Sequence, residues 1–136
     1  MKSQKLTSET ILDIGVTDRK FPAFNVGDTI AVSLYVTEGG KERVQVFEGD
    51  VIAIRHKGIA GTFTVRKIAA NNVAVERILP YHSPTIKSIV ITRRGISRRA
   101  KAYYVRHRTG KAVRFRELVL TKEQKQQRAH KHSVSE

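Results

Sequence analysis

Apolar and polar residues alternate along much of the chain between residues 21 and 92. The pattern is clearest over residues 29–37, where every second residue is Ile, Val or Leu. A period of two residues is typical of a strand with one buried and one exposed face. Further stretches with strand character cover residues 42–48, 51–54, 62–68, 73–79 and 86–92. Helical periodicity does not occur in this part of the sequence.

Turn residues separate these strands. Asn71 and Asn72 suit a tight turn because Asn tolerates positive φ, and Gly49 predicts a bulge or bend within a strand. Six or so short strands joined by turns predict a mainly β fold, a small antiparallel barrel or sandwich, and closing the sheet would remove its exposed edges. The expected core consists of Ile30, Val32, Leu34, Ile52, Ile54, Phe63, Val65 and Ile89.

The two ends of the chain have a different pattern. Residues 1–20 form an expected N-terminal arm, in which Ser8 would cap a short helix that stops at Gly15. Residues 118–136 form an expected charged tail, helical over about 121–131, where Thr121 and Gln124 have capping-box spacing. The sequence therefore predicts one β domain, residues 21–117, between a helical arm and a helical tail.

Charge is distributed very unevenly. The 136 residues include 26 Lys or Arg and 12 Asp or Glu, a net charge of +14. Residues 1–50 hold six basic and eight acidic side chains, whereas residues 51–136 hold twenty and four. The excess is greatest over residues 93–116, the basic stretch, which has ten basic residues and no acidic one. They are Arg93, Arg94, Arg98, Arg99, Lys101, Arg106, Arg108, Lys111, Arg114 and Arg116.

Apolar residues within the basic stretch indicate a folded surface rather than a loose tail. We expect a strand, a turn and a final strand over residues 112–116, with a helical turn around Ala100. A surface of one charge sign attracts polyanions. A membrane is disfavoured as the partner, because no apolar run approaches 18 residues and no amphipathic helix carries bulky apolar residues.

The basic stretch favours RNA recognised by its shape. Arg outnumbers Lys there by eight to two, and guanidinium grips phosphate through paired N–H donors and stacks on unpaired bases. No sequence-reading module occurs, and phosphate contacts carry no base information. Candidate stacking residues are Tyr81, Tyr103 and Tyr104. Basic residues on adjacent hairpins would extend the contact; they are Lys41, Arg43, Arg55, His56, Lys57, Arg66 and Lys67.

Enzyme chemistry has little support. The chain has no Cys, which fits a reducing compartment, and its five His residues are scattered without a nucleophile motif or a set of metal ligands. We expect no catalytic residue, cofactor or metal. The carboxylates within the β domain are expected to pair with Arg; they are Asp28, Glu48, Asp50 and Glu76. Two alternatives stay open: a free RNA-binding factor and, with less support, an RNA-processing enzyme.

An ordered series of short motifs between residues 24 and 117 resembles bacterial-type large-subunit ribosomal protein L nineteen. Each motif is weak alone, whereas the ordered series is specific. The motifs are Gly27-Asp28-Thr29, Glu38-Gly39, Arg43, Gln45-Val46-Phe47-Glu48-Gly49, Phe63-Thr64-Val65-Arg66-Lys67-Ile68, Val75-Glu76-Arg77, His82-Ser83-Pro84, Arg93-Arg94-Gly95, Arg99-Ala100-Lys101, Tyr103-Tyr104 with Arg106, and Gly110-Lys111-Ala112.

The resemblance implies a structural, non-catalytic protein of the cytoplasmic ribosome with an SH3-like barrel. It implies that the chain binds large-subunit ribosomal RNA at the face that meets the small subunit. Small-subunit ribosomal RNA at inter-subunit bridges and large-subunit ribosomal protein L fourteen would be its other partners. The chain departs from the family over residues 69–74, which lack the usual glycine.

Overall fold

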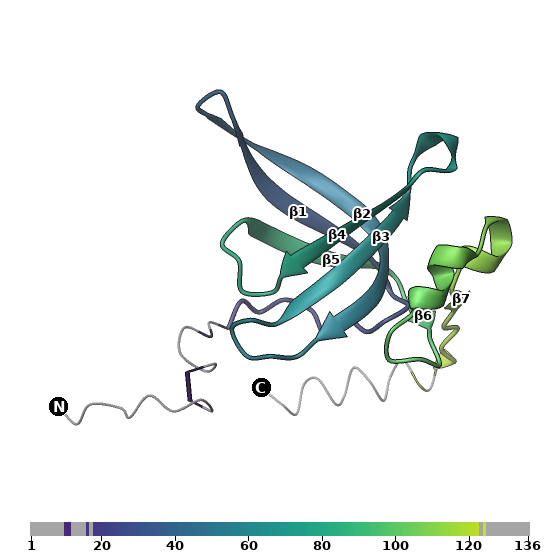
Figure 1. Ribbon diagram of the computed structural model, residues 1–136. Helices are drawn as coiled ribbons and strands as arrows, with labels where there is room; N and C mark the ends of the chain where they lie inside the picture. The colour runs from purple at the N-terminus through teal and green to yellow at the C-terminus, as the bar shows by residue number, and fades with distance from the viewer. Residues whose placement is uncertain (1–9, 12–15, 17, 123, 125–136) are drawn as a thin grey trace.

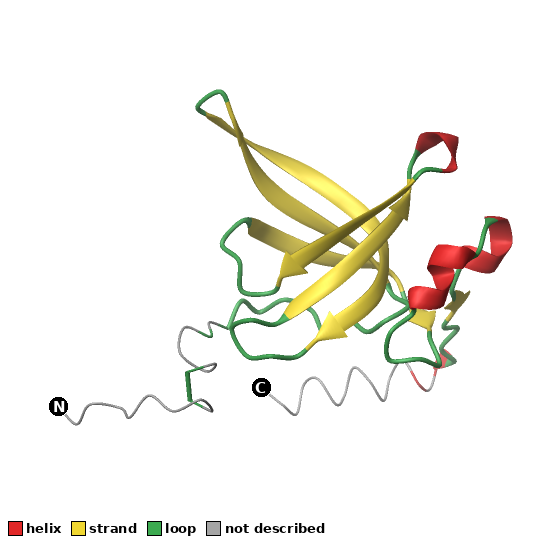
Figure 2. Cartoon of the chain, viewed as in Figure 1, coloured by secondary structure: helices red, strands yellow, loops and turns green. Residues whose placement is uncertain are grey.

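The computed structural model describes residues 10–11, 16, 18–122 and 124. These residues form seven strands and three short 3-10 helices (Figures 1 and 2). The strands are β1 (Thr29–Glu38), β2 (Lys41–Arg55), β3 (Thr62–Ile68), β4 (Ala74–Pro80), β5 (Ile86–Arg93), β6 (Gly95–Ile96) and β7 (Arg116–Glu117). The 3-10 helices are η1 (Ala70–Asn72), η2 (Tyr103–His107) and η3 (Gly110–Val113).

Five strands form one antiparallel sheet in the order β4-β3-β2-β1-β5. The strands expected from the alternating pattern are all present, but residues 42–48 and 51–54 merge into the single long strand β2. The β1–β2 hairpin extends well beyond the rest of the sheet (Figure 1). Consecutive strands are therefore neighbours except for β5, which pairs with β1.

The expected closed barrel is wrong, and the elements of the described residues include neither the expected helical arm nor the expected helical tail. The sheet is open, with β4 and β5 as its unpaired outer strands. Its apolar face is covered instead by side chains from the segment before β1 and from the β4–β5 loop, notably Phe21, Phe24 and Tyr81. Burial of the core thus does not require closure. The described elements include no α-helix, and most of the expected helical residues, 8–14 and 121–131, lie outside the described residues.

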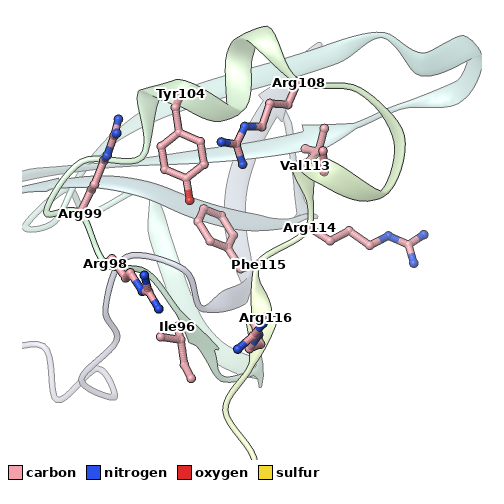
Figure 3. A pocket seen from close by; sticks show the side chains of 10 residues that line it. Ile96, Arg98, Arg99, Tyr104, Arg108, Val113, Arg114, Phe115 and Arg116 are labelled. Carbon is pink, nitrogen blue, oxygen red and sulfur yellow. The ribbon is translucent and has the colours of Figure 1, made fainter.

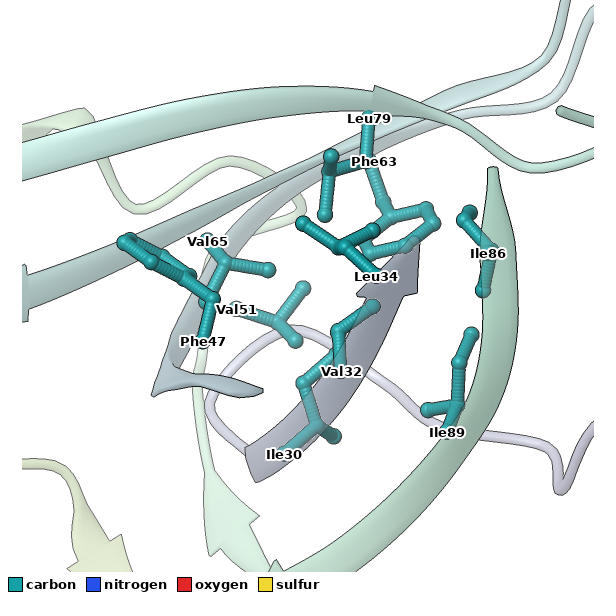
Figure 4. Packing of buried hydrophobic residues seen from close by; sticks show 10 residues of the cluster. All are labelled: Ile30, Val32, Leu34, Phe47, Val51, Phe63, Val65, Leu79, Ile86 and Ile89. Carbon is teal, nitrogen blue, oxygen red and sulfur yellow. The ribbon is translucent and has the colours of Figure 1, made fainter. Parts of the chain in front are cut away.

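Ten buried side chains from all five strands fill the concave side of the sheet (Figure 4). Six of the eight expected core residues are among them: Ile30, Val32, Leu34, Phe63, Val65 and Ile89. Ile54 is partly buried at the edge of this core. Ile52 is fully buried, but in a second cluster on the other side of the strand.

Two features of the turns follow from local chemistry. Asn71 and Asn72 both have positive φ, 61° and 57°, so the expected left-handed turn between β3 and β4 is confirmed without glycine. The register between β1 and β2 has no bulge at Gly49, which pairs with Ile30. A Cβ on Gly49 would lie 2.5 Å from the Arg66 carbonyl oxygen, so glycine permits close approach of the β3 backbone. The bulge of β2 comes three residues later, at Ile52.

The expected strands within the basic stretch are wrong. Its backbone follows η2 and η3, and β-pairing there is limited to the two-residue strands β6 and β7 and a single bridge between Lys101 and Ala53. Ala102 and Val105, three residues apart, are both buried. This spacing suits a 3-10 turn, which returns to the same side every three residues. A strand would have placed the two side chains on opposite faces.

Candidate nucleic-acid interface

Residues 94–117, here called the basic lobe, pack against one side of β2. The bulge at Ile52 inserts an extra residue opposite β3, and Ile52 and Ala53 both belong to the buried cluster that the lobe completes. The lobe contributes Ala102, Val105 and Phe115 to this cluster. The Ala102 amide donates to the Ile52 carbonyl at 2.7 Å. The lobe therefore packs on β2 at this bulge.

A buried carboxylate fixes the first residues of the lobe. Asp28 is 2% exposed and accepts hydrogen bonds from the backbone amides of Asn25, at 2.9 Å, and Gly95, at 3.0 Å. The Arg94 guanidinium donates to the same carboxylate at 3.0 Å. Because a buried charge is costly without partners, this arrangement specifies how the chain leaves β5. Arg94 is thereby committed to an internal ion pair.

A second carboxylate joins the lobe to the sheet. Glu76 on β4 accepts one hydrogen bond from Arg66 on β3, at 2.7 Å, and two from Arg106 on η2, at 2.8 and 2.9 Å. The hydrogen bonds from Arg106 and then Arg66 hold the pKa of Glu76 below its ordinary value, although burial opposes them. Conversely, Glu76 raises the pKa of Arg106. Arg66 and Arg106 therefore help to hold the lobe against the sheet.

Five arginines line one hollow on the outer side of the lobe (Figure 3). We call this depression of about 680 Å³ the arginine hollow. Its other lining residues include Tyr104 and Phe115; in Figure 3 the side chains of Arg98, Arg99 and Arg108 lie around these rings, and that of Arg114 points away from them. No Asp or Glu lines it. The five arginines are Arg98, Arg99, Arg108, Arg114 and Arg116.

Tyrosine rings hold several of the guanidiniums in place. Those of Arg99 and Arg108 lie 5.3 and 4.6 Å from the ring centre of Tyr104, and that of Arg106 lies 4.5 Å from the ring centre of Tyr103. The contacts of Arg99 and Arg108 do not use their N–H donors, which can bind a ligand, whereas Arg106 donates to Glu76. Two cations about one ring give the hollow a defined geometry.

The other expected contact residues fall into three groups. Lys101 and Lys111 are exposed on the lobe. Arg55, His56 and Lys57 are exposed in the loop after β2, and none of the ion pairs among the described residues involves them. The remaining ones occupy the hairpin tip or the sheet: Lys41, Arg43, which pairs with Glu38, Lys67, which lies over Phe47, and the half-buried Arg93.

The expected pairing of carboxylates with Arg holds for Asp28 and Glu76. Asp50 instead accepts a hydrogen bond from the Thr29 hydroxyl, and Glu48 takes part in no ion pair among the described residues. Sequence reasoning missed that both paired carboxylates attach the lobe to the sheet. The strand register, which brings Glu76 opposite Arg66, was the available signal for one of these contacts.

The described residues contain no group of three or more His, Asp or Glu side chains placed to hold a metal ion. None of their helices has the length and apolar character needed to cross a membrane.

Comparison with known proteins decides the family. The family model described as Ribosomal protein L19 matches residues 4–118, well over half of the chain. The chain belongs to the ribosomal protein L19 family. One relative, the large ribosomal subunit protein bL19 of Pseudothermotoga lettingae, is 50% identical over 99 residues, which cover 73% of this chain and 84% of that protein.

Membership of the L19 family establishes the general role of the chain. It is a structural constituent of the large subunit of the cytoplasmic ribosome and takes part in translation. It is not an enzyme, so the alternative of an RNA-processing enzyme is wrong. The alternative of a free RNA-binding factor is also wrong, because the chain is a component of the large subunit.

Proposed function

We propose that the chain binds large-subunit ribosomal RNA through the basic lobe, at or near the face that meets the small subunit. The arginine hollow carries this proposal, because five arginines line it and no carboxylate is among the lining residues. Like charges gathered on one surface repel one another, and a bound anion relieves that repulsion. A phosphate backbone supplies several anions at fixed spacing, and guanidinium binds each through paired donors.

The sheet acts as a rigid support for this contact. Asp28 and Glu76 hold the lobe in one orientation, and Tyr104 fixes two of the guanidiniums. The arginines therefore meet RNA in a geometry set before binding, which lowers the conformational entropy lost on association. Phosphate contacts of this kind select the shape of folded RNA rather than its sequence.

Bridging between subunits is the second part of the proposal. The tip of the β1–β2 hairpin, with Lys41 and Arg43, lies at the end of β1 away from the lobe (Figure 1). A ten-residue strand spans about 33 Å, so the tip and the lobe can contact different RNA segments. We assign the lobe to large-subunit RNA and the tip to small-subunit RNA, with large-subunit protein L fourteen packed alongside. The family resemblance supports these assignments.

Charge reversal in the hollow tests the proposal. We expect Arg98→Glu combined with Arg99→Glu to reduce the protein to below about a tenth of a copy per large subunit, because like charges would face the phosphates. Subunits separated on sucrose gradients in high salt and analysed by mass spectrometry give the copy number. Both side chains are exposed, so the isolated variant should stay folded.

A variant with the same change in net charge provides the control. Arg77→Glu combined with Lys87→Glu alters two exposed residues outside the candidate interface and should leave incorporation normal. If the Arg98 and Arg99 variant is folded and incorporates as well as the wild type, the lobe is not the RNA contact. If both variants fail equally, net charge rather than the hollow determines incorporation.

A further inference from the structure

A second hollow, separate from the arginine hollow, lies where β2 ends and β3 begins. It has a volume of about 490 Å³ and shares no lining residue with the arginine hollow. The segment before β1, the β2–β3 loop and the β4–β5 loop form its walls. A volume of this size lies within the range of about 300–1,000 Å³ typical of small-ligand pockets.

Aromatic side chains form one wall of this hollow. Phe24 and Phe63 pack edge to face with ring centres 5.1 Å apart, and Tyr81 packs in the same manner on Phe63, at 6.5 Å, and on His82, at 5.1 Å. Of these four rings only Phe63 is fully buried; the other three are half-buried at the wall. Burial and, to a smaller extent, the charge of Asp18 raise the pKa of Tyr81, so its phenol is a hydrogen-bond donor at neutral pH.

Cationic side chains form the rim. Arg55, His56 and Lys57 line the hollow from the loop after β2, and all three are exposed. No carboxylate is among the lining residues. An aromatic wall beside a cationic rim matches a ligand that has a flat ring and an attached anion.

We propose that this second hollow receives a single unpaired nucleotide of RNA, with its base against Tyr81 and its phosphate at Arg55 and Lys57. Unpaired bases are the part of RNA that proteins bind by stacking on aromatic rings, whereas paired bases are not available to enter a hollow of this size. The inference rests on the proposed binding of RNA. It adds a site that selects a structural feature, a bulged or flipped nucleotide, which the arginine hollow does not do.

The test uses the full chain and two RNA hairpins that differ by one nucleotide. One hairpin is fully paired, and the other has a single bulged 2-aminopurine, whose fluorescence reports stacking. We expect the bulged hairpin to bind at least about fivefold more tightly than the paired one, as one added stacking contact provides, with a change in 2-aminopurine fluorescence on binding.

Matched variants separate the two hollows. Arg55→Gln combined with Lys57→Gln changes only exposed side chains and should weaken binding of the bulged hairpin more than binding of the paired one, so that most of the preference is lost. Tyr81→Phe should retain the preference and Tyr81→Leu should lose it. Arg98→Gln combined with Arg99→Gln should weaken binding of both hairpins by the same factor.

The outcomes distinguish this inference from the proposed function. If the wild type binds the two hairpins equally, the nucleotide site is overturned, and the occupant of the hollow is a protein side chain instead. RNA binding by the lobe then still stands. A preference that survives both Tyr81→Leu and the Arg55 and Lys57 variant also overturns it. Absence of binding to either hairpin contradicts the proposed function itself.

Discussion

At the scale of single residues, two carboxylates determine where the cations point. Asp28 and Glu76 are two of the few acidic residues, yet each one forms an ion pair that orients an arginine of the basic stretch. The sequence indicated that they would pair with Arg, and that prediction is confirmed. It could not show which Arg each would take, because Asp28 and Arg94 are 66 residues apart and meet only through the fold.

The Glu76 contacts make stability depend on pH. A lowered carboxyl pKa adds stability that is present above the ordinary value of about 4.5 and is lost as pH falls through the lowered value. We expect Glu76→Gln to reduce the free energy of unfolding at pH 7 by about 1–2 kcal/mol, since charged hydrogen bonds are lost. Thermal melting should show a fall of about 4–8 °C for each kcal/mol.

The control for this prediction is Glu38→Gln. Glu38 also pairs with an Arg, but the two side chains are 63% and 53% exposed, so the change should be below about 0.5 kcal/mol. The difference between wild type and Glu76→Gln should shrink between pH 7 and pH 3. A difference that stays constant over that range would show that Glu76 acts by packing rather than by charge.

At the scale of elements, the alternation of apolar residues predicts every strand of the sheet but not the lobe. Period-two patterning is local, so β1, β3, β4 and β5 can be recognised within a few residues. The lobe forms around Ala102, Val105 and Phe115, whose burial depends on a distant strand. Alternation also does not show which strands lie at the edges of the sheet. The prediction of a closed barrel was wrong for this reason.

The junction between the sheet and β6 should tolerate no added side chain. A Cβ on Gly95 would lie 1.9 Å from the Gly27 carbonyl oxygen, so Gly95→Ala must separate two backbone segments. We expect a loss of about 1–3 kcal/mol in the free energy of unfolding. Faster amide hydrogen exchange at Ala102 and Leu118, which bond to Ile52 and Arg94, should report the displaced lobe.

Gly110→Ala is the matched change within the same lobe. Gly110 has φ of +65° and open space around it, so the substitution strains one residue locally, by about 1 kcal/mol, without separating segments. It should leave hydrogen exchange at Ala102 and Leu118 unchanged. Equal acceleration by both substitutions would mean that backbone strain alone, and not the Gly27 contact, loosens the lobe.

At the scale of the whole molecule, the excess of positive charge opposes folding in isolation. The described residues include 21 of the 26 Lys and Arg side chains, and four ion pairs form among them. The composition therefore predicted the anionic partner class correctly, because net charge needs no knowledge of the fold. The location of the unpaired cations did need it, since Arg98 and Arg114 line the same hollow only in the folded lobe.

Self-repulsion of this kind should be relieved by salt. We expect the melting temperature of the wild type to rise by several degrees between about 10 mM and 300 mM potassium chloride, because the Debye length shortens from roughly 30 Å to below 10 Å. Replacing Arg98, Arg114 and Arg116 together by Gln should reduce that rise by at least half. A salt dependence that is unaffected by the triple variant would place the repulsion elsewhere in the chain.

The bulge in β2 also has a consequence for how the protein can vary. Ahead of it, buried and exposed positions alternate, as at Phe47, Glu48 and Gly49. At the bulge, Val51, Ile52 and Ala53 are all buried, because the strand serves one core and then another. A complete substitution map of β2 should accordingly show every second position as permissive from residue 47 to residue 50. Residues 41–46, which are all exposed, should be permissive throughout, so the alternation in the map should begin at Phe47, and a block of three positions that accept almost no polar residue should follow at residues 51–53.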